Sequence, residues 1–268
     1  MGASLLLVGC GKMGGAMLDG WLKAGTVDRV VVVEPGGLPA GLNHPAISAA
    51  SGPQDLPAGF VPDVVVLAVK PQVMDGVMPA YAALVGPKTV FLSIAAGKTI
   101  DYFHRHLGSA AAIVRAMPNT PAAIGRGITV AVPNDGVSAD QRALCEALLA
   151  AVGEVAWADA ESQMDAVTAV SGSGPAYVFL LAEALAAAGQ AAGLPAELAQ
   201  RLARATVSGS GELLHQSPQP ASQLREAVTS PGGTTRAALD VLMAPDGMTE
   251  LMTRAVAAAA KRSQELAQ

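Results

Sequence analysis

The chain has 268 residues, a formal net charge of −5 and only 15% charged residues. This length allows one large α/β domain or two domains of ordinary size, and we expect two. Lys and Arg form no cluster, so the electrostatic footprint of a nucleic-acid-binding protein is absent and a small-molecule partner is expected. The cysteines, Cys10 and Cys145, lie in different predicted elements and indicate neither a disulfide framework nor a zinc knuckle.

The N-terminal apolar run is short and has no basic segment before it. Such a run is too short for a secretory signal or a membrane anchor. We therefore expect a cytoplasmic protein.

Up to about residue 158, short runs of β-branched residues alternate with helical stretches. Most of these runs are apolar without alternation, which is typical of strands covered on both faces in a mostly parallel sheet. The predicted strands are Ser4–Val8, Val30–Glu34, Val64–Val69, Thr89–Ile94, Ala111–Ala116, Ile128–Ala131 and Glu154–Trp157.

The first predicted strand leads into a glycine-rich turn, and a helix follows it. The turn reads Gly9-Cys10-Gly11-Lys12-Met13-Gly14, the G-x-G-x-x-G pattern in its strand–turn–helix setting. Gly9 permits the tight turn, Gly11 lets the backbone approach a pyrophosphate, and Gly14 allows close helix–strand packing. The alternative is a turn that only reverses the chain. We favour dinucleotide binding, and therefore a Rossmann-type domain over residues 1–158.

Glu34 closes the second predicted strand, twenty residues after Gly14. An acidic side chain here commonly accepts a hydrogen bond from the ribose 2′-hydroxyl of the coenzyme. The same carboxylate would repel the 2′-phosphate of NADPH, so Glu34 favours NADH. The alternative is a solvated residue at a strand end.

After about residue 159 the chain is rich in Ala and Leu and nearly lacks β-branched runs, which predicts an all-α domain over residues 159–268. Its helices are expected near residues 161–170, 175–192, 196–214, 221–228, 234–243 and 247–267.

The stretch from Ala176 to Leu194 is almost wholly apolar and long enough to span a bilayer. Glu183 lies near its middle, however, where a charge costs about 2.5–3.5 kcal/mol in lipid. A domain of this size cannot bury such a helix alone. We therefore expect no membrane partner and a homodimer in which these helices pack against their copies.

Five further segments resemble those of pyrroline-5-carboxylate reductases, and the resemblance covers nearly the whole chain. Three follow predicted strands, and two lie in the helical half. They are Ala68-Val69-Lys70-Pro71-Gln72, Ser93-Ile94-Ala95-Ala96-Gly97, Arg115-Ala116-Met117-Pro118-Asn119-Thr120-Pro121, Ser171-Gly172-Ser173-Gly174-Pro175-Ala176-Tyr177 and Thr229-Ser230-Pro231-Gly232-Gly233-Thr234-Thr235.

This resemblance implies reduction of L-1-pyrroline-5-carboxylate to L-proline by hydride from NADH or NADPH, the last step of proline biosynthesis. It also implies a homodimer and, beyond it, a ring of dimers. In an open α/β sheet a ligand lies beyond the carboxyl ends of the strands. The resemblance places the coenzyme's ribose and pyrophosphate beside Ala68, Val69, Lys70, Pro71, Ala95 and Ala96, and its nicotinamide near Met117, Pro118, Asn119 and Thr120.

The last of the five segments is a glycine-rich loop that enters a predicted helix at Thr234. The N–H groups of Gly232, Gly233 and Thr234 can therefore converge on a substrate carboxylate at the positive end of the helix dipole. The alternative is an ordinary capped helix after a proline turn. The resemblance gives Thr235 a hydrogen bond to the substrate's ring nitrogen and adds Glu161, Ser173 and Ser230 to the substrate site. Thr235 is too weak an acid to donate the proton, so water or a protonated imine would supply it.

Two other functions remain open. A β-hydroxyacid dehydrogenase or imine reductase relative would share the two-domain plan, but the lysine on which the former relies is missing between Pro175 and Lys261. A non-catalytic dinucleotide-binding scaffold would have no reason to keep the carboxylate-binding loop. The His104 and His106 pair has no carboxylate at metal-ligand spacing and falls on a predicted exposed helix, so no metal site is expected.

Overall fold

The computed structural model describes residues 2–38 and 42–266. Its contacts divide the chain into two units. The first runs up to Gly172 and includes the C-terminal segment from Ala260, and the second is Ser173–Ala259. Residues 161–172 stay with the first unit, where Met164 and Ala169 are buried. The division into residues 1–158 and 159–268 remains a prediction about domains with separate roles.

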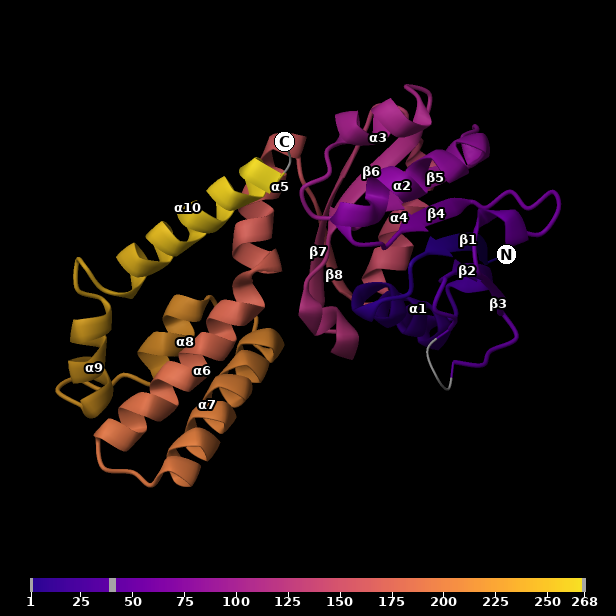
Figure 1. Cartoon of the computed structure of the whole chain (residues 1–268). Coiled ribbons are helices and arrows are strands. Elements are labelled where there is room, and N and C mark those ends of the chain that lie inside the picture. Colours follow the sequence, from indigo (N-terminus) through magenta and orange to yellow (C-terminus); the bar gives the residue numbers. More distant parts are fainter. Residues whose placement is uncertain (1, 39–41, 267–268) are drawn as a thin grey trace. The chain divides into compact units, whose positions relative to one another are not determined.

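The first unit contains an eight-stranded sheet in the order β3-β2-β1-β4-β5-β6-β7-β8 (Figure 1). The strands are β1 (Ala3–Val8), β2 (Val27–Val33), β3 (Ile47–Ala50), β4 (Val64–Leu67), β5 (Val90–Ser93), β6 (Ala112–Met117), β7 (Gly127–Pro133) and β8 (Gly153–Trp157). All neighbours are parallel except β6 and β7. The first six strands follow the Rossmann order.

The edge strand β3 was not predicted. It has only four residues, and the Ser and Ala side chains in it have little preference for strands. Two of its residues are exposed, because the strand lies at the rim of the sheet with one neighbour only. The other seven strands were predicted.

Helices cover both faces of this sheet (Figure 1). α1 (Lys12–Ala24) and α4 (Ala139–Ala150) pack with Leu5 and Leu7 on one face. On the other face, Leu6 and Val8 pack with α2 (Met74–Val77), the 3₁₀ helix Met78–Leu84 and α3 (Ile100–Leu107). Successive side chains of a strand point to opposite faces, so a strand covered on both sides is apolar along most of its length.

The second unit is helical, as predicted. Its helices are α6 (Gly174–Ala191), α7 (Ala196–Gln216), α8 (Ala221–Ala227), α9 (Thr234–Leu242) and the first part of α10 (Met248–Leu266). Before them, in the first unit, lie the 3₁₀ helix Glu161–Gln163, α5 (Met164–Val167) and a π-helical turn, Thr168–Gly172.

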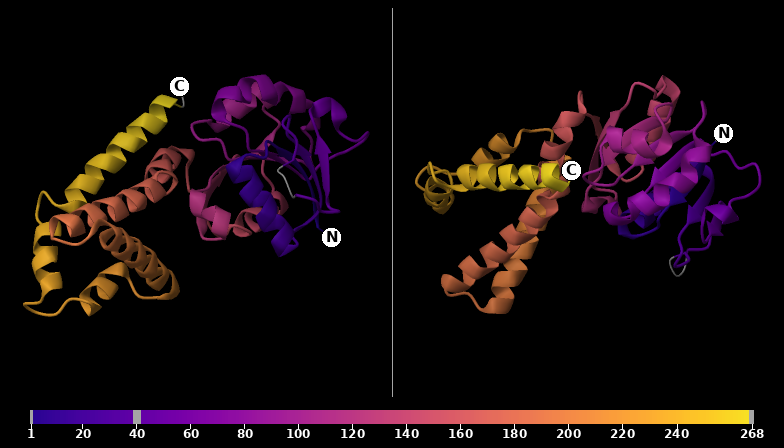
Figure 2. Two further views of the ribbon diagram at one scale, coloured as in Figure 1. Left: turned by 60° about the horizontal axis from the view of Figure 1, so that its bottom comes forward. Right: turned by 45° about the horizontal axis from the view of Figure 1, so that its top comes forward.

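α6 and α7 lie side by side as an antiparallel pair, coloured orange in Figure 2. Small residues at their contact let the two backbones approach closely: Ala186, Ala199 and Ala203 are buried, and a Cβ on Gly189 would lie 3.3 Å from the Ala199 Cβ. Each helix therefore buries only one narrow face within its own unit.

The remaining faces of this pair carry exposed apolar side chains. Phe179 is 64% and Leu180 61% exposed on α6, and Leu198, Leu202 and Leu213 are exposed on α7. The helical stretch Glu161–Ala191 is also long and apolar enough to cross a membrane by length and composition. Contiguous apolar surface of this kind marks an interaction site, which a second subunit or a bilayer could cover.

Candidate dinucleotide and substrate sites

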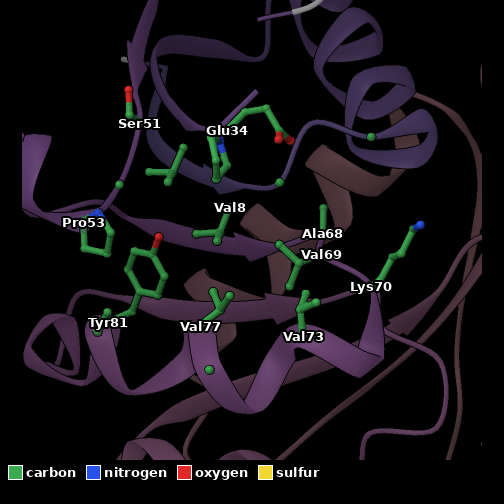
Figure 3. Close-up of a pocket in the computed structure, with 17 residues that line it drawn as sticks. Val8, Glu34, Ser51, Pro53, Ala68, Val69, Lys70, Val73, Val77 and Tyr81 are labelled. Atoms are coloured by element: carbon green, nitrogen blue, oxygen red, sulfur yellow. The ribbon is translucent and has the colours of Figure 1, made fainter. Parts of the chain in front are cut away.

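A cavity of about 640 Å³ opens at the carboxyl ends of β1, β2 and β4 (Figure 3). The chain order of the strands reverses direction between β1 and β4, and ligands of open α/β sheets bind at such a switch point. Six residues predicted to bind the coenzyme line this cavity: Gly9, Gly11, Glu34, Ala68, Val69 and Lys70.

The glycines of the turn have different structural roles. Gly9 has a φ of +90°, and a Cβ there would lie 2.9 Å from the Ala68 carbonyl oxygen. A Cβ on Gly14 would lie 2.5 Å from the Gly9 carbonyl oxygen. A Cβ on Gly11 would meet nothing within 4 Å. The fold therefore requires Gly9 and Gly14, whereas Gly11 leaves open space at the start of α1.

Glu34 follows β2 directly and lines the cavity. One of its carboxylate oxygens accepts a hydrogen bond of 2.7 Å from the Cys10 N–H. Burial and the nearby Glu34 carboxylate raise the pKa of the Cys10 thiol, which favours its protonated form. The bond holds a negative charge beside the glycine-rich turn.

The other predicted coenzyme residues lie outside the cavity lining. Cys10, Lys12 and Met13 belong to the turn and the first residues of α1, and Pro71 begins a 3₁₀ helix. Ala95 and Ala96 follow β5, with Ala95 buried and Ala96 exposed. Met117 ends β6, Pro118 is buried, and Thr120 is exposed. The Asn119 side-chain oxygen accepts a 2.9 Å hydrogen bond from the Ile128 N–H, which closes the connection to β7.

Two segments of the lining were missed. Ser51, Gly52 and Pro53 follow the unpredicted strand β3. Val73, Val77 and Tyr81 lie along the opposite side of the cavity in Figure 3. They come from the 3₁₀ helix Pro71–Val73, from α2 and from the 3₁₀ helix Met78–Leu84, so no single helical period marks them in the sequence.

Glu161 contacts two parts of the first unit. Its Oε1 accepts a 2.9 Å hydrogen bond from Nη1 of Arg115 on β6 and a 2.8 Å bond from the Ile100 N–H at the start of α3. Arg115 is only 5% exposed. The Glu161 carboxylate therefore compensates a buried cation.

In the second unit, the loop before α9 is a β-turn over Ser230–Gly233. The Gly233 N–H donates to the Ser230 carbonyl at 3.1 Å, and Gly232 has a φ of +71°. Pro in the second and Gly in the third position are typical of a type II turn. We expected the Gly233 N–H to face an anion, but it donates into the turn instead.

The start of α9 still offers backbone donors. Its N-cap is Gly233, which has no side chain to cap the helix. The first-turn N–H groups, those of Thr234, Thr235 and Arg236, have no acceptor within a helix that begins here. A cavity of about 320 Å³ beside this turn is lined by Thr229–Gly232 and Arg236. The arrangement suits a small anion.

Ser173 precedes the first turn of α6 as its N-cap, and its carbonyl accepts a 3.0 Å hydrogen bond from the Ala176 N–H. It lies in the second unit, whereas Glu161 lies in the first.

The histidine pair lies on α3, which is partly buried and not exposed as predicted. His104 Nε2 lies 2.9 Å from the Asn134 side-chain nitrogen, and His106 Nδ1 lies 2.9 Å from the Tyr102 carbonyl oxygen. Within residues 2–38 and 42–266, no three His, Cys, Asp or Glu side chains are grouped so that they could hold a metal ion.

Two family models match the chain. Residues 161–266 match pyrroline-5-carboxylate reductase dimerisation, and residues 4–97 match NADP oxidoreductase, coenzyme F420-dependent. These ranges fall on the helical segment and on the first part of the sheet.

Similar proteins cover the whole chain. A pyrroline-5-carboxylate reductase of Synechocystis is 41% identical, over 99% of this chain and 99% of its own. The solved structure of a pyrroline-5-carboxylate reductase from Coxiella burnetii is 33% identical with a TM-score of 0.88, over all of both chains. That of a pyrroline carboxylate reductase from Plasmodium falciparum with NADP bound is 29% identical with a TM-score of 0.80, over 99% of this chain and 98% of its own.

The predicted fold class, a Rossmann-type domain followed by a helical one, is thus confirmed, and so is the predicted class of NAD(P)H-dependent oxidoreductase. On these matches, the chain belongs to the pyrroline-5-carboxylate reductase family.

Proposed function

We propose that the protein reduces L-1-pyrroline-5-carboxylate to L-proline with hydride from a nicotinamide dinucleotide. The observation that carries this proposal is the β-turn Ser230–Gly233 leading into α9, beside a cavity of about 320 Å³ that Thr229–Gly232 and Arg236 line. A cyclic imine that bears a carboxylate matches such a site. Family membership supports the same reaction.

In this proposal the first unit binds the coenzyme, which supplies the hydride when bound. Gly11 and the start of α1 receive the pyrophosphate, and Glu34 receives the adenosine ribose. The proposed coenzyme site is made of Gly9, Cys10, Gly11, Lys12, Met13, Gly14, Glu34, Ala68, Val69, Lys70, Pro71, Ala95, Ala96, Met117, Pro118, Asn119 and Thr120.

We further propose a preference for NADH over NADPH. The Glu34 carboxylate is held beside the cavity by the Cys10 N–H. It can accept a hydrogen bond from a 2′-hydroxyl, whereas a 2′-phosphate would meet a like charge.

The substrate site is proposed for the second unit. The N–H groups at the start of α9 hold the carboxylate, and the Thr235 hydroxyl orients and polarises the ring nitrogen. Water or an already protonated imine supplies the proton, because a Thr hydroxyl is too weak an acid. Ser173, Ser230, Gly232, Gly233 and Thr234 complete this set, to which the family resemblance adds Glu161. Productive transfer requires the imine carbon within about 3–3.5 Å of the hydride donor.

We propose a homodimer formed through the second unit, because α6 and α7 expose apolar faces and the matching family model describes dimerisation. A ring of such dimers, a cytoplasmic location, and the lack of membrane or nucleic-acid partners are part of the proposal. So are separate roles for residues 1–158, which bind coenzyme, and residues 159–268, which bind substrate and dimerise.

The test is an assay with NADH or NADPH and pyrroline-5-carboxylate, followed by the loss of nicotinamide absorbance and the appearance of proline. We expect both signals in equal amounts. Coenzyme that binds but is not consumed would identify a non-catalytic scaffold. Formation of NADH from NAD⁺ and a 3-hydroxy acid, without any reduction of the imine, would identify a dehydrogenase instead.

A further inference from the structure

We propose that Arg115 and Glu161 are a pair of positioning residues, which fix the loop after β5 and the end of β6 in the arrangement that receives the coenzyme. The proposal rests on the proposed function, since it takes the coenzyme to lie beside Ala95, Ala96 and Met117. In it, Glu161 acts through Arg115 and α3, in place of the substrate contact that the family resemblance implies for it.

The placement of Arg115 follows from its strand. Side chains alternate along β6, and Ile113 packs in the apolar cluster that also contains Phe103 of α3. Arg115 is two residues further on and points to the same face, where it is 5% exposed. A guanidinium does not lose its charge in proteins, so at this depth it requires a counter-charge. Glu161 supplies it at 2.9 Å.

The same carboxylate oxygen also completes the start of α3. It accepts the Ile100 N–H at 2.8 Å, while the Thr99 hydroxyl accepts the Tyr102 N–H at 3.1 Å. A negative charge is favourable at this positive helix end. The loop from Ala95 leads directly into this helix. One oxygen atom therefore joins the loop after β5, the buried cation of β6 and the chain at Glu161.

The end of β6 is held from a second side. Met117 lies two residues beyond Arg115, and its methyl group occupies the space that a Cβ on Gly172 would need. Gly172 ends the π-helical turn that follows α5, and this turn belongs to the same unit as Glu161. Met117 thus ends the strand that carries Arg115, and its side chain packs against the segment that carries Glu161. A change in the ion pair should move this side chain.

The experiment compares Glu161→Gln, Glu161→Asp and Arg115→Lys with the wild type. The dissociation constant of NADH or NADPH is measured by titration without substrate, and kcat and both KM values are measured in the assay. Misplacement of reacting groups by an ångström can cost about a hundredfold in rate. We expect Glu161→Gln to lower kcat about tenfold or more and to weaken coenzyme binding, with the KM of the imine changed less. Glu161→Asp and Arg115→Lys keep both charges, so they should lose less kcat and less coenzyme affinity than Glu161→Gln.

Ser138→Ala is the matched control. The Ser138 hydroxyl accepts the Gln141 N–H at 3.2 Å in the capping box of α4, so its loss destabilises the same unit away from the proposed site. This variant should leave coenzyme binding unchanged. If Glu161→Gln behaves like Ser138→Ala, the pair is structural only and the proposal is wrong.

Two further results decide the matter. A rise in the KM of the imine alone, with coenzyme binding intact, would assign Glu161 to direct substrate contact and overturn the proposal. If Glu161→Gln does not fold, Glu161→Asp and Arg115→Lys carry the comparison. If the wild type reduces no imine, the proposed function fails, but coenzyme titration of the variants still tests the pair.

Discussion

The Cys10 N–H and the Glu34 carboxylate are joined by a hydrogen bond of 2.7 Å that links the glycine-rich turn to the end of β2. The two residues are 24 positions apart in the chain, and both lie at carboxyl ends of neighbouring parallel strands. Because the bond fixes the carboxylate, its charge acts on whatever enters the cavity, and coenzyme preference can be tested at this one side chain.

Glu34→Gln should shift the coenzyme preference towards NADPH. An amide oxygen can still accept the Cys10 N–H, so the turn should keep its conformation while the charge is removed. Relief of one like-charge contact near the surface corresponds to about 1–2 kcal/mol, or about a tenfold shift in the ratio of kcat/KM for NADPH to that for NADH. Steady-state kinetics with both coenzymes measure it. An unchanged ratio would mean that Glu34 is only a solvated residue at a strand end.

Gly11→Ala should weaken coenzyme binding without unfolding the protein. A Cβ here meets nothing within 4 Å, so the change should cost at most about 1 kcal/mol of stability as a less favourable helix N-cap. The methyl group would occupy the approach of the pyrophosphate, and we expect the coenzyme dissociation constant to rise about tenfold or more.

Gly14→Ala provides the contrast, because its Cβ would lie 2.5 Å from the Gly9 carbonyl oxygen. Overpacking of this kind costs about 1–3 kcal/mol, which lowers the melting temperature by several degrees. Thermal melts and coenzyme titrations of both variants measure the two effects. Equal destabilisation by the two changes would contradict the different roles given to these glycines.

The sheet and the helical half could be predicted because their signals are local. Apolar runs mark strands covered on both faces, and β1 and β4 were found in this way. β3 carries no such run, and it forms only because β2 offers it an edge. Because β3 was not predicted, Ser51 and Pro53, which follow it and line the cavity, were not predicted either.

The pairing of Arg115 with Glu161 could not be predicted, because 46 residues separate them in the chain and no local pattern links the two. The Gly233 hydrogen bond is a different case. The string Ser230-Pro231-Gly232-Gly233 already indicates a type II turn, in which the fourth residue donates to the first. That signal was available in the sequence.

Thr235→Ala should lower kcat while leaving coenzyme affinity nearly unchanged. Loss of one hydrogen bond to a charged or polarised nitrogen corresponds to about 1.5–3 kcal/mol, or about a tenfold to hundredfold fall in kcat. Thr235→Ser should retain much of the activity. Thr253→Ala is the control, since this exposed hydroxyl donates at 2.8 Å to the Thr249 carbonyl within α10. Equal losses of turnover and of coenzyme affinity in Thr235→Ala would show that its role is misplaced.

Alkaline pH should destabilise the first unit, in part through Tyr81. Burial raises the pKa of this phenol from its usual value of 10.0 to about 12 in the folded protein. Between these two values the unfolded chain loses a proton that the folded protein keeps, so the free energy of unfolding falls as pH rises through this window. Below pH 10 the contribution of the buried Tyr81 to the free energy of unfolding is fully present.

Tyr81→Phe removes this titration and nearly preserves the side chain's shape. Urea unfolding at several pH values from 9 to about 12 should give a shallower loss of stability for the variant than for the wild type. Parallel curves would mean that Tyr81 titrates alike in both states.

Phe179→Glu should dissociate the proposed dimer and abolish turnover together with it. Phe179 on α6 is 64% exposed, and the neighbouring Leu180 is exposed too. An apolar side chain at this position is explained by burial against a second copy of the chain and not by burial within the monomer. A charge forced into such an interface costs several kcal/mol and should raise the dimer dissociation constant about a hundredfold or more. Gln190→Glu adds the same charge at an exposed polar position of the same helix and should change neither property.

Sedimentation velocity gives the mass of each variant, and the reductase assay gives its activity. A Phe179→Glu protein that stays dimeric would move the interface to another face of the second unit, and a fully active monomer would show that the site is complete within one chain.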